Sequence, residues 1–353
     1  MPVITRELLR ALPKAELHCH LDGSVRPETM LELAREYRQP MPADDPDELR
    51  EHMIVKNAHN LEEYLERFTV TLSVMQRAEA LERIAYELAE DAARDGVRYL
   101  EVRYSPVLNI REGLSMDETI EAVTRGLARA EQVHGIIGRV IVCALRHLEP
   151  RVSLQLAQLA VAYRNRGVVA FDLAGGERAH PARLHAEAFA FARQHEMAVT
   201  VHAGEGDGAE SVRQAVHICG AHRLGHATRL IEDESLTRYV NDRRIPLEVC
   251  LTSNVQTHAA DSFGAHPVRT YFDRGMNVVL NTDNRLMSGT TLTDEYLLAA
   301  RHHRFTFEEL STIALNGFAS AFISWEERQR LMRSALEEIQ RLRGPSAASF
   351  TPA

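Results

Sequence analysis

Eight short strand-like segments, most of them rich in β-branched and aliphatic residues, recur along this chain, and stretches with helical periodicity separate them. The predicted strands are 15–23, 97–104, 139–145, 167–173, 198–202, 223–226, 245–250 and 276–281. Such alternation is typical of parallel strands joined by crossover helices, and eight repeats predict an α/β protein with a (β/α)8 barrel. A doubly wound open sheet is disfavoured because no Gly-x-Gly-x-x-Gly turn follows the early strands.

The segment between the first two predicted strands is longer than one crossover helix requires, so we expect additional helices to be inserted there. Bulky apolar residues with i, i+3, i+4 and i+7 spacing lie on one helix face in this segment. They are Leu61, Tyr64, Leu65 and Phe68. This helix either covers a pocket, as part of a lid at about residues 40–95, or packs its stripe against the core. We expect a single domain at 1–343 and a disordered tail at 344–353.

Composition restricts the partners and the compartment. A formal net charge of −9 disfavours nucleic acid, because phosphate binding requires a basic face. The four cysteines are widely spaced and include no Cys-x-x-Cys pair, so neither a disulfide framework nor a thiolate zinc site is expected. Residues 4–10 form a short amphipathic stretch without a long apolar run, which disfavours a secretion signal or a membrane span. These features predict a cytoplasmic protein that acts on a small molecule.

Ionisable residues occur where several of the predicted strands end. His18 and His20 lie on the same face of the first strand, because side chains alternate along a strand. His202 ends the fifth predicted strand, His226 ends the sixth, and Asp283 follows the eighth. The carboxyl ends of barrel strands meet on one face, where barrel enzymes place their active sites. Histidine nitrogens and a carboxylate oxygen suit zinc, so we expect a metal site on this face.

A further carboxylate follows the fifth predicted strand. Glu205 lies in His202-Ala203-Gly204-Glu205-Gly206, where small residues allow the backbone to approach a ligand closely. A carboxylate beside a metal-bound water can transfer protons. The alternative, a solvated loop residue, is equally compatible with the sequence.

Several motifs, in order along the chain, resemble the signature motifs of the adenosine deaminase family. They are 17–24 (Leu-His-Cys-His-Leu-Asp-Gly-Ser), 172–175 (Asp-Leu-Ala-Gly), 201–205 (Val-His-Ala-Gly-Glu), 225–226 (Gly-His) and 281–283 (Asn-Thr-Asp). The segment 100–106, Leu-Glu-Val-Arg-Tyr-Ser-Pro, is similar to the same family. The resemblance extends from about residue 12 to residue 322, and it implies a TIM barrel of the amidohydrolase superfamily.

The resemblance also implies roles for individual residues. One catalytic zinc ion per chain would be held by His18, His20, His202 and Asp283. Glu205 would be the acid and base at the purine ring, while His226 and Asp283 would orient the attacking oxygen and stabilise charge. The implied substrate contacts are His20, Asp22 at the ribose hydroxyls, Gly175 at the ring edge, Asn284, and the lid residues Leu61, Tyr64, Leu65 and Phe68.

Three positions depart from the pattern of the better-known family members. Asn284 replaces an aspartate that faces N7 of the purine, and an amide can donate to this acceptor without taking up a proton. Gly176 replaces an acidic residue, and Ala227 stands after His226 where glycine is usual. These departures concern the identity of the substrate more than the type of reaction.

We therefore predict a zinc-dependent aminohydrolase that converts adenosine or 2′-deoxyadenosine to inosine or 2′-deoxyinosine and ammonia. Another 6-aminopurine compound remains an alternative, either a nucleoside with a large 5′ substituent such as aminodeoxyfutalosine, or free adenine. Adenine is disfavoured because Asp22 would then lack a ribose partner. A hydrolase with two metals bridged by a carboxylated lysine is disfavoured because the predicted strands contain no lysine. A non-catalytic purine-binding protein is the distant alternative. It is disfavoured because such a protein would have a broken site, whereas the metal and proton-transfer positions are intact.

Overall fold

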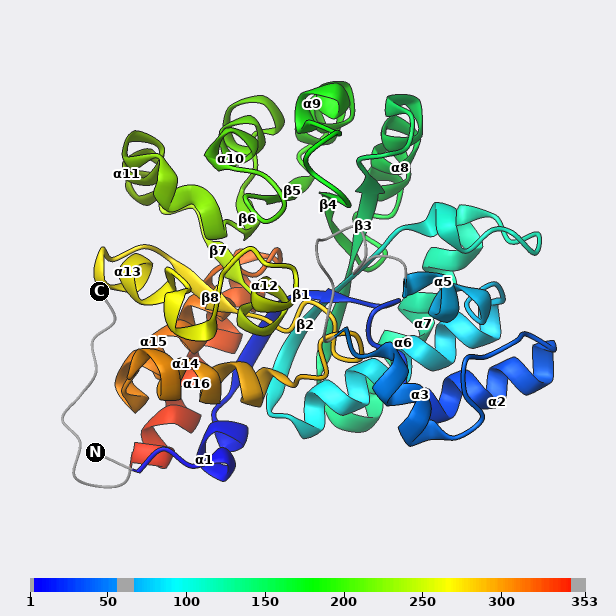
Figure 1. Ribbon diagram of the computed structural model, residues 1–353, viewed down its shortest axis with the longest axis horizontal. Coiled ribbons are helices and arrows are strands. Elements are labelled where there is room, and N and C mark those ends of the chain that lie inside the picture. The colour runs from blue at the N-terminus through cyan, green and yellow to red at the C-terminus, as the bar shows by residue number, and fades with distance from the viewer. Residues whose placement is uncertain (1–2, 56–66, 344–353) are drawn as a thin grey trace.

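Eight parallel strands form the centre of the computed structural model, which describes residues 3–55 and 67–343 (Figure 1). Each strand pairs with the next one along the chain, in the order β1 to β8. Their bounds are β1 Lys14–His20, β2 Val97–Tyr104, β3 Ile137–Leu145, β4 Val168–Ala174, β5 Ala198–Ala203, β6 Arg223–His226, β7 Leu247–Val249 and β8 Val278–Leu280. The predicted (β/α)8 barrel is confirmed.

The barrel is closed by the residues that follow β8. An isolated parallel bridge joins Cys19 to Asp283. The backbone N–H of His20 donates to the carbonyl of Asp283 at 2.7 Å, and the N–H of Asp283 donates to the carbonyl of His18 at 2.9 Å. Backbone pairing between the first strand and the end of the last one therefore brings three of the predicted site residues together.

Helices surround the strands on the outside of the barrel (Figure 1). Helix α1 Arg6–Ala11 precedes β1, and α2 Pro27–Tyr37, α3 Pro46–Met53, α5 Phe68–Ser73 and α6 Ala78–Arg94 lie between β1 and β2, which confirms the predicted insertion. The later helices are α7 Met116–His134, α8 Pro150–Ala162, α9 Ala186–Gln194, α10 Ala209–Gln214, α11 Glu234–Asp242, α12 Leu251–Gln256, α13 Val268–Asp273, α14 Leu292–His303, α15 Phe307–Ala319 and α16 Trp325–Arg343. Within the described ranges, no helix combines the length and apolarity needed to cross a bilayer.

Local signals explain several of the element boundaries. Helix α7 begins with a capping box, in which the Ser115 side chain accepts from the N–H of Glu118 and the Glu118 carboxylate accepts from the N–H of Ser115. Strands β7 and β8 are shorter than predicted. Pro246 has no N–H to donate to a ladder before β7. Before β8, the N–H of Val278 donates locally to the carbonyl of Met276.

Strand β1 begins one residue earlier than predicted, so the prediction that no strand contains a lysine is wrong. The Lys14 side chain is fully buried, and its Nζ donates to the carbonyls of Leu9 at 2.7 Å and Leu12 at 2.8 Å. Burial lowers the pKa of Lys14 to about 7. Because these bonds hold the amine at the opposite end of β1 from His20, Lys14 does not provide a bridging ligand for two metals.

Helix α7 packs against α6 so closely that Gly126 has no space for a larger side chain. A Cβ atom at this position would lie 2.2 Å from the backbone carbonyl oxygen of Glu82. We expect Gly126→Ala to lower the melting temperature, because overpacking costs about 1–3 kcal/mol and exceeds the roughly 1 kcal/mol that alanine gains in helix propensity. Gly264→Ala is the control, since nothing lies within 4 Å of a Cβ there. Equal melting temperatures for both variants, measured by circular dichroism, would contradict this account.

Candidate active site

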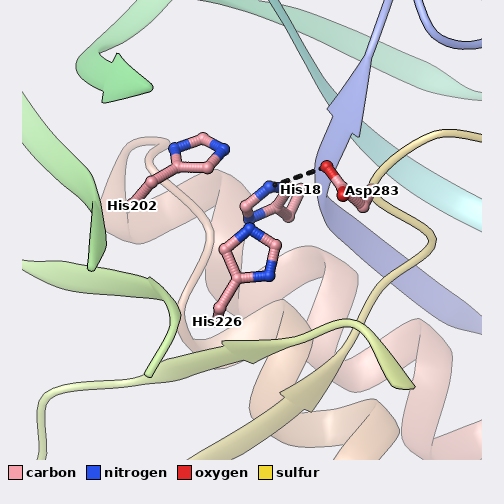
Figure 2. Close-up of side chains that lie close together, drawn as sticks. All are labelled: His18, His202, His226 and Asp283. Carbon is pink, nitrogen blue, oxygen red and sulfur yellow. Dashed lines mark ion pairs between the residues drawn. The ribbon is translucent and has the colours of Figure 1, made fainter. Parts of the chain in front are cut away.

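Four of the ionisable residues singled out in the sequence lie close together at the carboxyl ends of the strands (Figure 2). His18 lies on β1, His202 on β5 and His226 at the end of β6, while Asp283 follows β8. One potential ligand atom from each of these four buried residues lies within 4.8 Å of the others. The cluster is a candidate metal site, and it joins residues from both ends of the chain.

His20 also reaches this cluster. Its Nε2 is 3.1 Å from Nε2 of His202 and 3.3 Å from Oδ1 of Asp283, and Nε2 of His18 is 3.2 Å from the same Oδ1. Neighbouring ligand atoms around tetrahedral zinc, each about 2.0–2.2 Å from the metal, are about 3.4 Å apart. Two sets of four ligands are therefore geometrically available, and they share His18, His202 and Asp283. The fourth member is either His20 or His226.

Carboxylates orient two of the histidines toward the cluster. Nδ1 of His18 is 2.9 Å from Oε2 of Glu248, and Nδ1 of His202 is 3.2 Å from Oδ1 of Asp172. A proton on each Nδ1 is donated to its carboxylate, which leaves the lone pair of Nε2 facing the cluster. Metal-ligating histidines are typically held in this way.

A single arginine joins the two orienting carboxylates. The fully buried Arg103 donates to Asp172 Oδ2 at 3.0 Å and to Glu248 Oε2 at 2.9 Å. Burial favours the neutral form of Asp172, but His202 and Arg103 hold the pKa of Asp172 below its usual range. Burial likewise opposes ionisation of Glu248, whereas Arg103 and Arg223 hold the pKa of Glu248 well below its usual range. Both groups therefore remain carboxylates that accept from the histidines.

The short helix α12 and its C-terminal cap contact three of the candidate residues. The contacts are Ser253 Oγ to Asp283 Oδ2 at 2.6 Å, Asn254 Nδ2 to His226 Nδ1 at 2.9 Å and Thr257 Oγ1 to Glu205 Oε1 at 3.0 Å. Each contact places a neutral hydrogen-bonding group against an ionisable one. One segment after β7 thus orients side chains that come from three other parts of the barrel.

A third buried carboxylate, that of Glu177, fixes the loop that carries Glu205. The buried Glu177 side chain accepts hydrogen bonds from three successive backbone N–H groups, those of Gly204 at 3.0 Å, Glu205 at 2.9 Å and Gly206 at 3.0 Å. The Glu205 side chain then reaches His226, with Oε2 at 3.4 Å from Nε2. The position of Glu205 therefore depends on Glu177 through the backbone.

A cavity of about 290 Å³ lies beside the cluster, and Asp22, Gly175, Asn284 and Phe68 line it. Oδ1 of Asp22 is buried without a hydrogen-bond partner, and burial raises the pKa of Asp22 to about 7. Oδ1 of Asn284 also has no partner and lies against Gly23. The remaining predicted contacts fall outside the described residues: Leu61, Tyr64 and Leu65.

Two of the candidate residues have left-handed backbone conformations. His226 has φ 61° and Asp283 has φ 62°, and Ala227 follows with φ 52°. This region costs a non-glycine residue roughly 1–2 kcal/mol, so the fold stabilises an unfavourable conformation at the ends of β6 and β8. Such strain is concentrated at functional sites. It also explains why glycine would suit position 227 better than alanine.

A family profile described as adenosine deaminase matches residues 13–338. The chain belongs to the adenosine deaminase family. It is 40% identical to an adenosine deaminase of Clostridium acetobutylicum over 329 residues, which cover 93% of this chain and 98% of that protein. It is 44% identical to a probable adenosine deaminase of Dictyostelium discoideum over 341 residues, which cover 96% of this chain and 44% of that longer protein. The chain is therefore an enzyme of the aminohydrolase class.

Solved structures of related proteins share the fold. An amidohydrolase from Burkholderia ambifaria with bound zinc has a TM-score of 0.87 at 25% identity, over 97% of this chain and 95% of that one. An Arabidopsis protein named ADAL, in complex with IMP, has a TM-score of 0.85 at 29% identity, over 95% and 99% of the two chains. These similarities agree with a metal site in an amidohydrolase barrel.

Sequence reasoning missed the residues that orient the candidate ligands. Asp172 and Glu248 carry charges inside strands that are otherwise apolar, and this signal could have been used. Arg103 lies in a strand that also contains Arg98 and Glu101, so its sequence context does not single it out. Asn254 and Glu177 carry no comparable signal, because they lie in polar stretches of sequence.

The contacts of Glu177 predict a change in local dynamics. We expect Glu177→Gln to speed amide hydrogen exchange at 204–206 by about 10–100-fold, because an amide places an N–H₂ group against at least one backbone donor, and an unsatisfied buried donor costs about 1–3 kcal/mol. The exposed Glu187 on α9 supplies the control, and Glu187→Gln should leave these rates unchanged. Unaltered exchange at 204–206 in the Glu177 variant would show that this carboxylate does not hold the loop.

Proposed function

We propose that this enzyme is a zinc-dependent adenosine deaminase, which converts adenosine and 2′-deoxyadenosine to inosine and 2′-deoxyinosine with release of ammonia. The observation that carries the proposal is that the metal-fitting cluster adjoins one small cavity, on whose wall His20, His202, Asp283 and the Glu205 carboxylate lie. Its volume of about 290 Å³ suits a small-molecule ligand. The similarity to the adenosine deaminase of C. acetobutylicum supports the same reaction here.

We assign the zinc ion to His18, His20, His202 and Asp283. Three imidazoles and one carboxylate are a suitable donor set for zinc, and the spacing of the four ligand atoms supports the assignment. Oδ2 of Asp283 accepts from Ser253, which leaves Oδ1 directed at His18 and His20. When bound, zinc supplies a Lewis acid that generates a nucleophile from water near neutral pH.

The protein side chains carry out the remaining steps. Glu205 delivers a proton to N1 of the purine, and this weakens the aromatic resistance to attack at C6. Thr257 orients the Glu205 carboxyl group for this transfer. His226 and Asp283 line the same cavity, where they would orient the attacking water and stabilise the charge that develops on it. Because these groups are buried and already oriented, their electrostatic effect is stronger than it would be in water.

The cavity favours a nucleoside among the possible 6-aminopurine substrates. The open Oδ1 of Asp22 is suited to a ribose hydroxyl, which free adenine lacks. Among the described residues, no arginine or lysine lines the cavity, so a 5′-phosphate would have no strong cationic partner there. We further propose that Gly175 contacts the ring edge, that the Asn284 amide donates to N7, and that His20 borders the substrate as well as the metal.

The helices inserted after β1 would form the outer wall of the substrate site. Phe68 and Leu72 of α5 line the cavity, which supports a lid within about residues 40–95 of a single domain at 1–343. The contacts expected of Leu61, Tyr64 and Leu65 stay predictions. We also propose a cytoplasmic location, with which four buried free cysteines are consistent.

Replacement of the proposed proton donor tests the reaction. We expect Glu205→Gln to reduce kcat for adenosine by about 10²–10⁴-fold, because the amide cannot transfer the proton to N1. Zinc content should stay near one per chain, since Glu205 is outside the assigned ligand set. Glu187→Gln serves as the surface control and should keep the wild-type kcat. If the Glu205→Gln variant retained more than about a tenth of kcat, Glu205 would not be the proton donor.

Replacement of a proposed ligand tests the metal assignment. His202→Ala should lower the zinc content, measured by atomic absorption, from about one per chain to near zero, because three remaining ligands hold the ion weakly. Activity should fall in parallel. His217→Ala alters an exposed histidine of the segment after α10 and should retain zinc. Stoichiometric zinc in the His202 variant would remove this residue from the ligand set.

A further inference from the structure

A chain of hydrogen bonds leads from the backbone near α13 to His226. It starts at the N–H of Val268, passes through His266 and Asn254, and ends at Nδ1 of His226. The side chains of all three polar residues are buried. Because a backbone N–H can only donate, the direction of every bond in the chain can be deduced from its first member.

The first step determines the tautomer of His266. The N–H of Val268 donates to Nδ1 of His266 at 3.1 Å, so this nitrogen carries a lone pair and no proton. Burial, together with the nearby His303, lowers the pKa of His266 to about 3, which keeps the ring neutral. The single ring proton of His266 therefore lies on Nε2.

The second step determines the orientation of the Asn254 amide. Nε2–H of His266 is 3.1 Å from Oδ1 of Asn254, and the hydroxyl of Thr228 donates to the same oxygen at 3.0 Å. Two donors thus identify the oxygen end of the amide. The other end, Nδ2, is 2.9 Å from Nδ1 of His226 and can only donate to it.

We propose that Asn254 and His266 are positioning residues that hold His226 as the Nε2–H tautomer, so that it presents a hydrogen-bond donor to the reaction site. The role of this tautomer in catalysis rests on the proposed function. A lone pair on Nδ1 is required to accept from Asn254, and the proton of the neutral ring then lies on Nε2. This nitrogen faces Oε2 of Glu205 at 3.4 Å.

His226 differs from His18 and His202 in the group that its Nδ1 contacts. His18 and His202 donate from Nδ1 to carboxylates and keep a lone pair on Nε2, whereas His226 accepts at Nδ1 from an amide. A protonated Nε2 cannot bind a metal. The fourth ligand is therefore His20 rather than His226, and Oε2 of Glu205 faces the N–H of His226 as a hydrogen-bond acceptor.

The tautomer can be measured directly in the intact zinc-loaded enzyme. Protein labelled with ¹⁵N-histidine should show, in long-range ¹H–¹⁵N correlation spectra, a protonated Nε2 and an unprotonated Nδ1 for His226. Asn254→Asp is nearly isosteric and still accepts from His266 and Thr228, but it accepts at His226 as well. We expect a proton to appear on Nδ1 of His226 in this variant. A protonated Nδ1 in the wild-type enzyme, or no change in the variant, would overturn the proposal.

Two variants of His266 test whether the chain of hydrogen bonds from Val268 controls the tautomer of His226. The amide of His266→Gln can accept from Val268 and donate to Asn254, so the wild-type tautomer of His226 should be kept. His266→Leu can do neither, and we expect a mixture of His226 tautomers together with a fall in kcat for adenosine of about tenfold or more and little change in KM. Identical His226 spectra in the two variants would show that the chain of hydrogen bonds does not control the tautomer. The spectra report the tautomer whether or not adenosine is the substrate, so failure of this proposal and failure of the proposed function are distinguishable.

Discussion

Arg103, shared between Asp172 and Glu248 at the centre of the barrel, is the interaction on which the site depends. Buried ions lose several kcal/mol of hydration each, and these three remain charged because each one has more than one partner. Arg103 also donates to the carbonyl of Leu17 at 2.6 Å, and Glu248 accepts from Arg223 at 2.6 Å. The carboxylates that neutralise the arginine are the same ones that orient two candidate zinc ligands. Stability of the core and orientation of the ligands are therefore linked.

The identity of the group at Nδ1 of each imidazole distinguishes the histidines of the cluster. A carboxylate at Nδ1 leaves a lone pair on Nε2, as for His18 and His202, and the lone pair suits a metal. An amide N–H at Nδ1 has the opposite effect at His226, whose Nε2 then carries the proton. Chemically identical side chains thus acquire two functions within one cluster, because their partners come from β4, β7 and α12.

Helix α12 illustrates how a short element can serve several catalytic groups. Its residues and its cap contact Asp283, His226 and Glu205, which belong to different strands or loops. His226 and Asp283 reach these partners from left-handed backbone conformations, and such conformations persist only where surrounding contacts stabilise them. Closure of the barrel through the backbone of Asp283 supplies part of that stabilisation.

Sequence patterns predicted the barrel and the convergence of the histidines and Asp283 on one of its faces. Both depend on local patterns, namely the alternation of strand-like and helical segments and the placement of histidines and Asp283 at strand ends, and these predicted which residues would meet. The sequence did not identify Arg103, Glu248, Asn254 or Glu177 as partners of those residues. Hydrogen bonds depend on distances and directions between atoms from distant parts of the chain, and no periodicity records them. Which nitrogen of His18, His202 and His226 carries the proton depends on Asp172, Glu248 and Asn254, and folding alone brings these partners to the imidazoles.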